Sequence, residues 1–357
     1  MSSIYLKLLE MKPEDCPVLA TVTGSSGSTP QKPGSSALFD RSGLRAGTVG
    51  GGATEGQVTD YALDSVTTGV SALLHFQLNN DISRKEEPIC GGELTVLVDS
   101  KPLASIRAFR AMEDSLKRRV PGILVTMVTK NTGNSVLINR YWMTEGAYPE
   151  LPEYFLKKLV PEVNNMISSA NRAGFRQLEL AIPGEEPESL FLLEAVFPEP
   201  HLVIAGAGHI GRALSHLGNL LDFEVTLIDD RSEFANRENL PDAHNIIVGD
   251  IGKTISEIRK DKSTYIVIVT RGHSNDADAL KACIGSAAAY VGMIGSRPKV
   301  AKIHREFIEK GYASEEQWSG IFTPIGLEIN SQTVNEIAVS IAAQLIQIRN
   351  KKNKVSG

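Results

Sequence analysis

The amino-acid sequence predicts an α/β protein in which an N-terminal α+β domain precedes a C-terminal doubly wound parallel sheet. Two observations predict the fold of the C-terminal half. From residue 200 onward, short apolar segments alternate with helical segments, which is typical of a parallel sheet covered on both faces. The first apolar segment runs into Gly206-Ala-Gly-His-Ile-Gly211, and acids end the next one about twenty residues later. This combination of strand, G-x-G-x-x-G turn, helix and acid predicts a Rossmann-type nucleotide-binding domain.

Length and composition indicate a globular protein of two domains. The chain has 357 residues, 42% of them hydrophobic and 22% charged, and single domains usually span about 100–200 residues. A net charge of −5 gives no reason to expect nucleic acid, which calls for a basic stripe. The sequence shows no signal-peptide pattern, no apolar run long enough for a membrane and only three, widely spaced cysteines. We therefore expect a cytoplasmic protein.

Two prolines in Phe197-Pro198-Glu199-Pro200 mark the domain boundary, because proline ends one strand directly before the next begins. The sequence thus predicts an N-terminal domain over 1–196, a Rossmann-type domain over 197–350 and a solvated tail over 351–357.

The N-terminal domain carries mixed strand and helix signals. Residues 18–23 predict a strand, and 24–30 a loop, because glycine and serine predominate there. A hairpin is expected around 40–43, and a helix after Gly50-Gly51-Gly52, where Thr54 and Gln57 have capping-box spacing. Further expectations are strands over 94–98, 123–129, 135–139, 177–182 and 190–196, and helices over 103–119 and after Pro152. In the C-terminal domain we expect strands over 202–205, 224–229, 245–248, 265–270 and 289–294.

The glycine turn is the first candidate site. Gly206 makes the tight turn, Gly208 lets the backbone approach a phosphate, and Gly211 lets the helix pack on the strand. Asp229 and Asp230 are placed to accept from a ribose hydroxyl, and Arg231 could instead meet a phosphate. The alternative is that all three are ordinary residues of a strand-end turn. His209 lies inside the turn, close to any bound phosphate.

Two further loops follow strands of the same sheet, so they meet the same edge. Arg271 and His273 come after the fourth strand and could line the crevice, although a single histidine is more often structural. Ser296 and Arg297 come after the fifth strand, where serine is a good N-cap and arginine could clamp an anion. Plain capping with a surface arginine is the alternative.

The N-terminal domain offers two more candidates. Gly50, Gly51 and Gly52 precede a helix whose first N–H groups could bind an anion, and Glu55 follows in its first turn. The alternatives are a crowded turn that needs glycine and an acid that stabilises the helix dipole. Cys90 precedes two glycines, which predicts an accessible thiol able to bind metal or carry sulfur, or else a small buried residue. No metal-ligand spacing and no nucleophile–base motif accompany these residues.

Taken together, these segments resemble the XdhC/CoxI family over nearly the whole chain. The resemblance rests on residues 21–34 and 47–52, on Cys90-Gly-Gly, and on the glycine turn with residues 227–231, 270–273, 290–297, 322–328 and 336–343. Many relatives carry a cysteine directly after the triple glycine, where this chain has Ala53. Any role of that cysteine is therefore lost here or falls to Cys90.

The resemblance implies an accessory chaperone for a molybdenum hydroxylase such as xanthine dehydrogenase. Such proteins are thought to bind molybdenum cofactor (molybdopterin), protect it while its sulfido ligand is installed, and deliver it to the apo-enzyme. For this chain the resemblance implies cofactor binding between the two domains, a homodimer, and the apo-enzyme and a cysteine desulfurase as partners.

Two rival hypotheses remain open. The glycine turn could instead bind NAD(P) in a true oxidoreductase, although the chain is too short for flavin and molybdenum domains and lacks cysteine clusters for iron–sulfur centres. Cys90 could alternatively make the protein a sulfur carrier.

Overall fold

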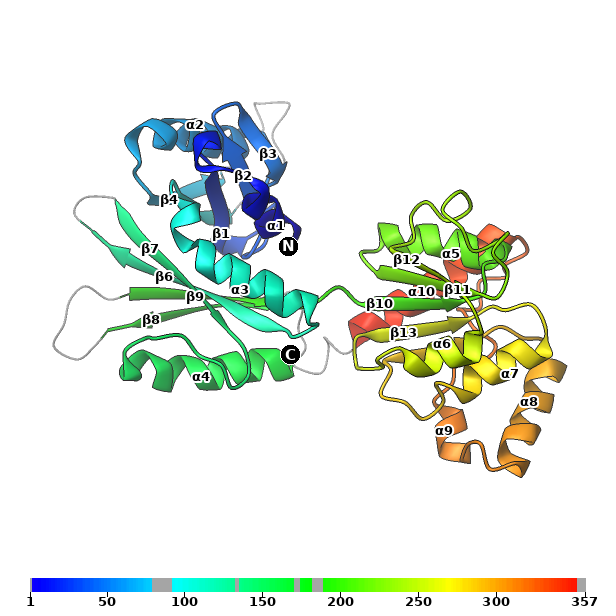
Figure 1. Cartoon of the computed structure of the whole chain (residues 1–357). Helices are drawn as coiled ribbons and strands as arrows, with labels where there is room; N and C mark the ends of the chain where they lie inside the picture. The colour runs from blue at the N-terminus through cyan, green and yellow to red at the C-terminus, as the bar shows by residue number, and fades with distance from the viewer. Residues whose placement is uncertain (1, 79–91, 132–134, 170–173, 182–188, 352–357) are drawn as a thin grey trace. The chain divides into compact units, whose positions relative to one another are not determined.

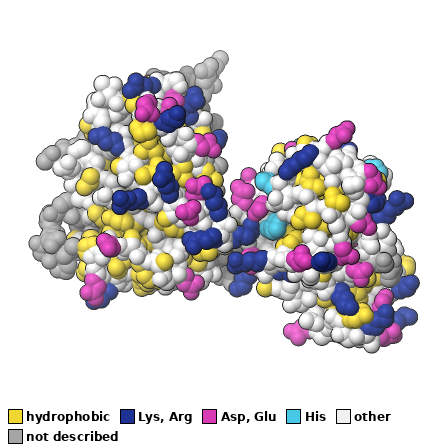
Figure 2. Space-filling view, viewed as in Figure 1, with side chains coloured by type: hydrophobic (Ala, Val, Ile, Leu, Met, Phe, Trp, Pro, Cys, Tyr) yellow, Lys and Arg dark blue, Asp and Glu magenta, His cyan; other side chains and the backbone are white. Residues whose placement is uncertain are grey.

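The computed structural model describes residues 2–78, 92–131, 135–169, 174–181 and 189–351. The chain divides into two compact units between Pro198 and Glu199, two residues beyond the boundary expected from the sequence. Each hydrophobic core cluster lies wholly within one unit. Figure 1 labels the helices and strands of both units. None of the described helices is long and apolar enough to cross a membrane. On the face shown in Figure 2, basic and acidic side chains are intermixed rather than gathered in one stripe.

Unit 1 contains an antiparallel sheet of order β3-β2-β1-β5-β4. Its strands are β1 (Val18–Gly27), β2 (Ser36–Asp40), β3 (Gly43–Gly47), β4 (Ala72–Leu78) and β5 (Gly92–Asp99). The loop expected over 24–30 is wrong in its first half, because β1 pairs with β5 as far as Gly27, beyond a bulge at Val22 and Gly24. Helix α2 (Gly52–Thr68) covers one face with Val58 and Ala62.

The predicted capping box of α2 is also wrong. Gly51 is the N-cap and no side chain caps the helix, while Thr54 is buried within its first turn. Helix α1 (Ser2–Glu10) packs with α3 (Ile106–Lys117) in a separate core.

A second antiparallel sheet completes unit 1, with order β7-β6-β9-β8. Its strands are β6 (Gly122–Lys130), β7 (Val136–Met143), β8 (Phe175–Leu180) and β9 (Ser189–Val196). Along β6, Ile123 and Val125 face α4 (Glu153–Ser168), whereas Leu124 joins the core of α1 and α3 (Ile106–Lys117). This alternation of apolar side chains on both faces explains why β6 is buried almost throughout.

Unit 2 is a doubly wound parallel sheet, as predicted, and its strand order is β12-β11-β10-β13-β14. Its strands are β10 (His201–Ala205), β11 (Glu224–Asp229), β12 (Asn245–Val248), β13 (Thr264–Ile268) and β14 (Tyr290–Met293). Leu202 and Ile204 face the core under α5 (His209–Leu220) and α10 (Val334–Lys351). Val203 and Ala205 face the opposite core, which is covered by α6 (Ile251–Glu257), α7 (His273–Lys281) and α8 (Arg297–Glu309) (Figure 1). The short α9 (Glu315–Ser319) follows.

The strand order places the glycine turn at a switch point. The chain leaves β10 toward β11 and β12, then crosses back to β13 on the other side of β10. In open parallel sheets, ligands bind at the carboxyl ends of the strands where the order reverses. Gly206 follows β10 at this position.

Candidate functional site

The three glycines of the turn have different surroundings. Gly206 has a φ of +113°, and a Cβ there would lie 2.6 Å from the Val269 carbonyl oxygen. A Cβ on Gly211 would lie 1.9 Å from the Gly206 carbonyl oxygen, so the start of α5 packs directly on the turn. A Cβ on Gly208 would meet no atom of the described residues within 4 Å. Gly208 therefore borders open space, as a residue beside a ligand should.

The first turn of α5 has free hydrogen-bond donors. Gly208 is its N-cap, and no side chain in the described part of the chain caps the helix with a hydrogen bond. The preceding N–H, that of Ala207, donates to Asp229 Oδ2 at 2.6 Å. The first N–H groups of a helix, together with its dipole, attract anions. This end of α5 is therefore suited to hold a phosphate, and His209 is an exposed residue there.

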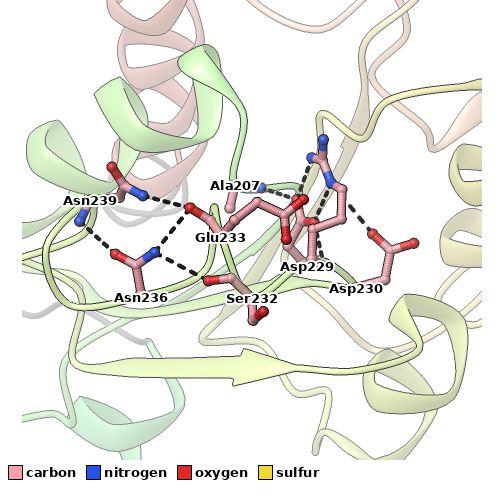
Figure 3. A network of polar contacts seen from close by, with 8 residues as sticks. Ala207, Asp229, Asp230, Ser232, Glu233, Asn236 and Asn239 are labelled. Carbon is pink, nitrogen blue, oxygen red and sulfur yellow. Dashed lines mark hydrogen bonds and ion pairs between the residues drawn. The ribbon is translucent and has the colours of Figure 1, made fainter.

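Asp229 is buried and bonded on both oxygens (Figure 3). Its Oδ1 accepts from the Arg231 N–H at 3.0 Å and from Nε at 2.9 Å, and its Oδ2 accepts from Nη2 at 3.0 Å and from Ala207. Burial raises the pKa of this carboxyl, but the hydrogen bonds from Arg231 and Ala207 outweigh it, and the pKa is lowered overall. A ribose hydroxyl, the predicted partner of Asp229, would have to share an oxygen that the chain already uses.

The loop after β11 is held by its own side chains (Figure 3). Asn236 donates to the carbonyls of Ser232 and Glu233, and Asn239 donates to that of Glu233 at 2.9 Å. The guanidinium of Arg231 lies 4.1 Å from the ring centre of Phe234. Sequence reasoning missed these asparagines, although both residue types and their spacing are common in turns.

A small crevice of about 140 Å³ lies between the ends of β11 and β13. Asp230 and Arg231 line one side, and Thr270, Arg271 and Asn275 line the other. Arg271 is exposed at this rim. His273 is the first residue of α7, but its side chain lies outside the described part of the chain.

A buried ion pair, also missed from the sequence, ties two helices to the end of β13. Asp276 is fully buried, accepts from Thr270 Oγ1 at 2.5 Å and pairs with the ammonium of Lys299. Burial raises the pKa of Asp276, and the contacts with Lys299 and Thr270 lower it. The effect of burial is larger, so the pKa is raised overall. Because Asp276 belongs to α7 and Lys299 to α8, the pair fixes both helix starts beside the glycine turn. In the sequence, this ion pair is indicated only by an acid in the first turn of α7 and by a lysine shortly after Ser296-Arg297.

Ser296 is the N-cap of α8, as predicted, but its hydroxyl makes no capping hydrogen bond. Ser296 and Arg297 are both exposed and follow the carboxyl end of β14. The structure therefore brings the predicted residues of unit 2 to one edge of one sheet.

The candidates of unit 1 form a separate group. Gly50, Gly51 and Gly52 all have positive φ, at 141°, 69° and 59°. Glu55 accepts from Thr48 Oγ1 at 2.6 Å and from the Val49 N–H at 3.1 Å. The acid thus organises the turn itself. Cys90 lies outside the described residues.

Comparisons with known proteins match both units. The model of the XdhC Rossmann domain matches residues 202–345, and that of the XdhC and CoxI family matches residues 14–77. Escherichia coli (strain K12) YqeB is 32% identical over 152 residues, which are 42% of this chain and 28% of that protein. This chain therefore spans under a third of that relative.

Two further relatives match nearly end to end. A Bacillus subtilis (strain 168) protein, named as a probable subunit of xanthine dehydrogenase, is 24% identical over 340 residues, 94% of this chain and 93% of that one. A crystal structure described as a xanthine dehydrogenase from Bacillus halodurans has a TM-score of 0.77 at 22% identity, covering 99% of this chain and 98% of the other. At this identity the likeness shows the fold.

Proposed function

Because the chain belongs to the XdhC and CoxI family, we propose that it is an accessory chaperone that binds molybdenum cofactor and delivers it to a xanthine dehydrogenase-like molybdenum hydroxylase. The Bacillus subtilis relative, matched over nearly its whole length, carries xanthine dehydrogenase in its name. The cofactor is cargo in this proposal, and the proposed partner is the apo-enzyme. A cysteine desulfurase and a second copy of this chain are further proposed partners.

One observation of the structure supports cargo binding most directly. The start of α5 is uncapped and Gly208 faces open space, so the site fits the phosphate of a pterin cofactor. Helix N–H groups would hold that phosphate, with His209 beside them and Arg271 and Arg297 on the same edge of the sheet. Binding a phosphorylated ligand needs no nucleophile, so a site of this kind supports the proposal of a carrier rather than a catalyst.

The test is saturable cargo binding under reducing, anaerobic conditions. The protein is loaded with molybdenum cofactor, separated from free cofactor and oxidised, and the released pterin is measured by its fluorescence. Bound pterin close to one equivalent is expected. Gly208→Ala should weaken binding, because its methyl group would occupy the space next to the phosphate without touching the chain. Gly56→Ala, which also meets no atom within 4 Å, is the matched control. Lack of saturable binding would contradict the proposal.

The small crevice beside Arg231 and Arg271 favours a second candidate, an oxidoreductase that uses NAD(P) at the same turn. It predicts micromolar dinucleotide binding, about −8 kcal/mol, and hydride transfer to a substrate. Titration calorimetry with the oxidised and reduced forms of NAD and NADP decides between the chaperone and the oxidoreductase. The sulfur-carrier hypothesis predicts that Cys90→Ser abolishes partner activation, and unchanged activation would reject it.

A further inference from the structure

A groove of about 480 Å³ lies along the exposed side of α5. This side is opposite the buried residues Gly211, Leu214 and Gly218, which face the sheet. The loop after β11 forms the facing wall, and the first residues of α10 also line the groove. The crevice beside Arg231 shares no lining residue with it.

Helix α5 contributes His209, Arg212 and His216 to the groove. Their spacing of three and four residues places them on one helix face. The Arg212 guanidinium makes a single long hydrogen bond of 3.5 Å, to Asn239, and pairs with no carboxylate in the described part of the chain. His216 Nδ1 lies 2.8 Å from Asp242 Oδ2, so the acid orients the ring. The cation of Arg212 is therefore available to a ligand.

Ser215 gives an independent sign of a ligand. Its side chain is buried, at 1% exposure, and it lines the groove. Its Oγ has no hydrogen-bond partner among the described residues. A buried hydroxyl without a partner is destabilising, so a polar group of a ligand that reached Ser215 from the groove would stabilise this part of α5.

The size and lining of the groove indicate what that ligand is. From His209 to His216 the helix rises about 10 Å, at about 1.5 Å per residue, which matches the length of a heterocycle joined to a phosphate. Ala213, Pro241 and Val334 supply apolar surface for a flat ring. Asp242 and His216 lie along the same groove as polar partners for the ring edge.

We propose that this groove binds a phosphorylated planar heterocycle, with its phosphate at the start of α5 beside His209 and Arg212 and its ring against Ala213 and Pro241. A nucleoside monophosphate and a pterin phosphate share this chemistry. The pterin form rests on the proposed function, whereas the groove itself does not.

The test uses the full chain and three probes, namely AMP, a 6-hydroxymethylpterin phosphate and inorganic phosphate, each titrated by calorimetry. Arg212→Gln should weaken all three by about tenfold, because it removes a charge-assisted contact to phosphate. Val334→Trp, at an exposed position of the groove, should block AMP and the pterin but spare inorganic phosphate. Arg305→Gln makes the same change of charge on the exposed face of α8 and should leave all three unchanged.

The preferred heterocycle identifies the source of the ligand. Unchanged affinities in both groove variants, or no binding of either heterocycle at millimolar concentration, would overturn the groove proposal. Molybdenum cofactor that still binds both groove variants at wild-type strength overturns the pterin form of the proposal while leaving the proposed function intact. Heterocycle binding that depends on Arg212, in a protein that fails to take up molybdenum cofactor, supports the groove and rejects the proposed function.

Discussion

At the scale of single residues, the chain uses buried carboxylates to fix backbone beside its candidate site. Asp229 holds the N–H of Ala207 in the glycine turn, and Asp276 joins the end of β13 to Lys299. The sequence predicts an acid at the end of the second strand of unit 2. It does not predict the partner of that acid, because Arg231 and a ribose hydroxyl can both donate hydrogen bonds to the carboxylate. The G-x-G-x-x-G spacing predicts that the backbone packs tightly at the glycines, but which atoms lie against each glycine is known only from the structure.

Gly211→Ala should destabilise unit 2 by about 2 kcal/mol or more, because its Cβ would lie 1.9 Å from the Gly206 carbonyl oxygen and the helix would have to shift. Gly208→Ala, with open space around its Cβ, should cost less than about 1 kcal/mol, the usual effect at an N-cap. Urea denaturation followed by circular dichroism measures both. Equal midpoints for the two variants would show that α5 does not pack on the turn as described.

Glu194 in unit 1 should make stability depend on pH. Its side chain is buried, Tyr5 Oη donates to Oε2 at 2.5 Å, and Oε1 has no partner among the described residues. Burial raises its pKa from 4.5 to about 7, against lowering contributions from Tyr5 and Arg140. The folded state thus holds the proton more tightly than the unfolded state, so the contribution of Glu194 to stability is greatest below pH 4.5 and falls as the pH rises through 7. The loss is about 3 kcal/mol, at about 1.4 kcal/mol per pH unit.

Glu194→Gln should remove this part of the pH dependence, whereas Glu179→Gln, at an exposed position of β8, should retain it. The measurement is the free energy of unfolding in urea at pH 5 and at pH 8. If wild type and Glu194→Gln lose the same stability between these two values, Glu194 does not titrate as described.

At the scale of elements, the sequence is most informative where pairing is regular. The bounds of β11 and β12 agree with the expected 224–229 and 245–248, because each is a short apolar run between turn residues. The extension of β1 to Gly27 could not be foreseen, since only pairing with β5, far along the chain, makes a strand of glycines and serines. Helix α1 and strand β4 were missed because their apolar residues pack against distant elements.

The pair of Asp276 and Lys299 predicts a coupling between elements. Lys299→Met should destabilise the protein by about 2 kcal/mol, less than the usual cost of breaking a fully buried pair because Lys299 is partly exposed. Replacing the acid as well, by Asp276→Asn, should restore part of that loss, since the uncompensated carboxylate is gone. Thermal unfolding compares these variants with Lys302→Met, at an exposed position of α8. Additive losses in the double variant would show that the two side chains do not interact.

At the scale of the whole molecule, the two units differ in how their sheets are built. Unit 1 uses antiparallel sheets whose strands pair with sequence neighbours and with distant segments, whereas unit 2 uses parallel strands joined by helices. The uncapped start of α5, the crevice beside Arg231 and the groove along α5 are all formed by unit 2 alone. The family match to residues 202–345 covers these features in a single segment of the chain.

This division predicts that unit 2 is autonomous in folding and in ligand binding. Each core cluster of unit 2 draws only on residues between Leu202 and Ile348, so a chain of residues 199–357 keeps its entire hydrophobic interior. It should unfold cooperatively in urea and bind AMP or the pterin phosphate within about threefold of the full chain, because both groove walls remain. Residues 1–198, expressed separately, should also fold cooperatively but bind neither probe. A non-cooperative transition in 199–357 would mean that unit 1 completes its core. Cooperative unfolding with lost affinity would instead assign part of the ligand site to unit 1.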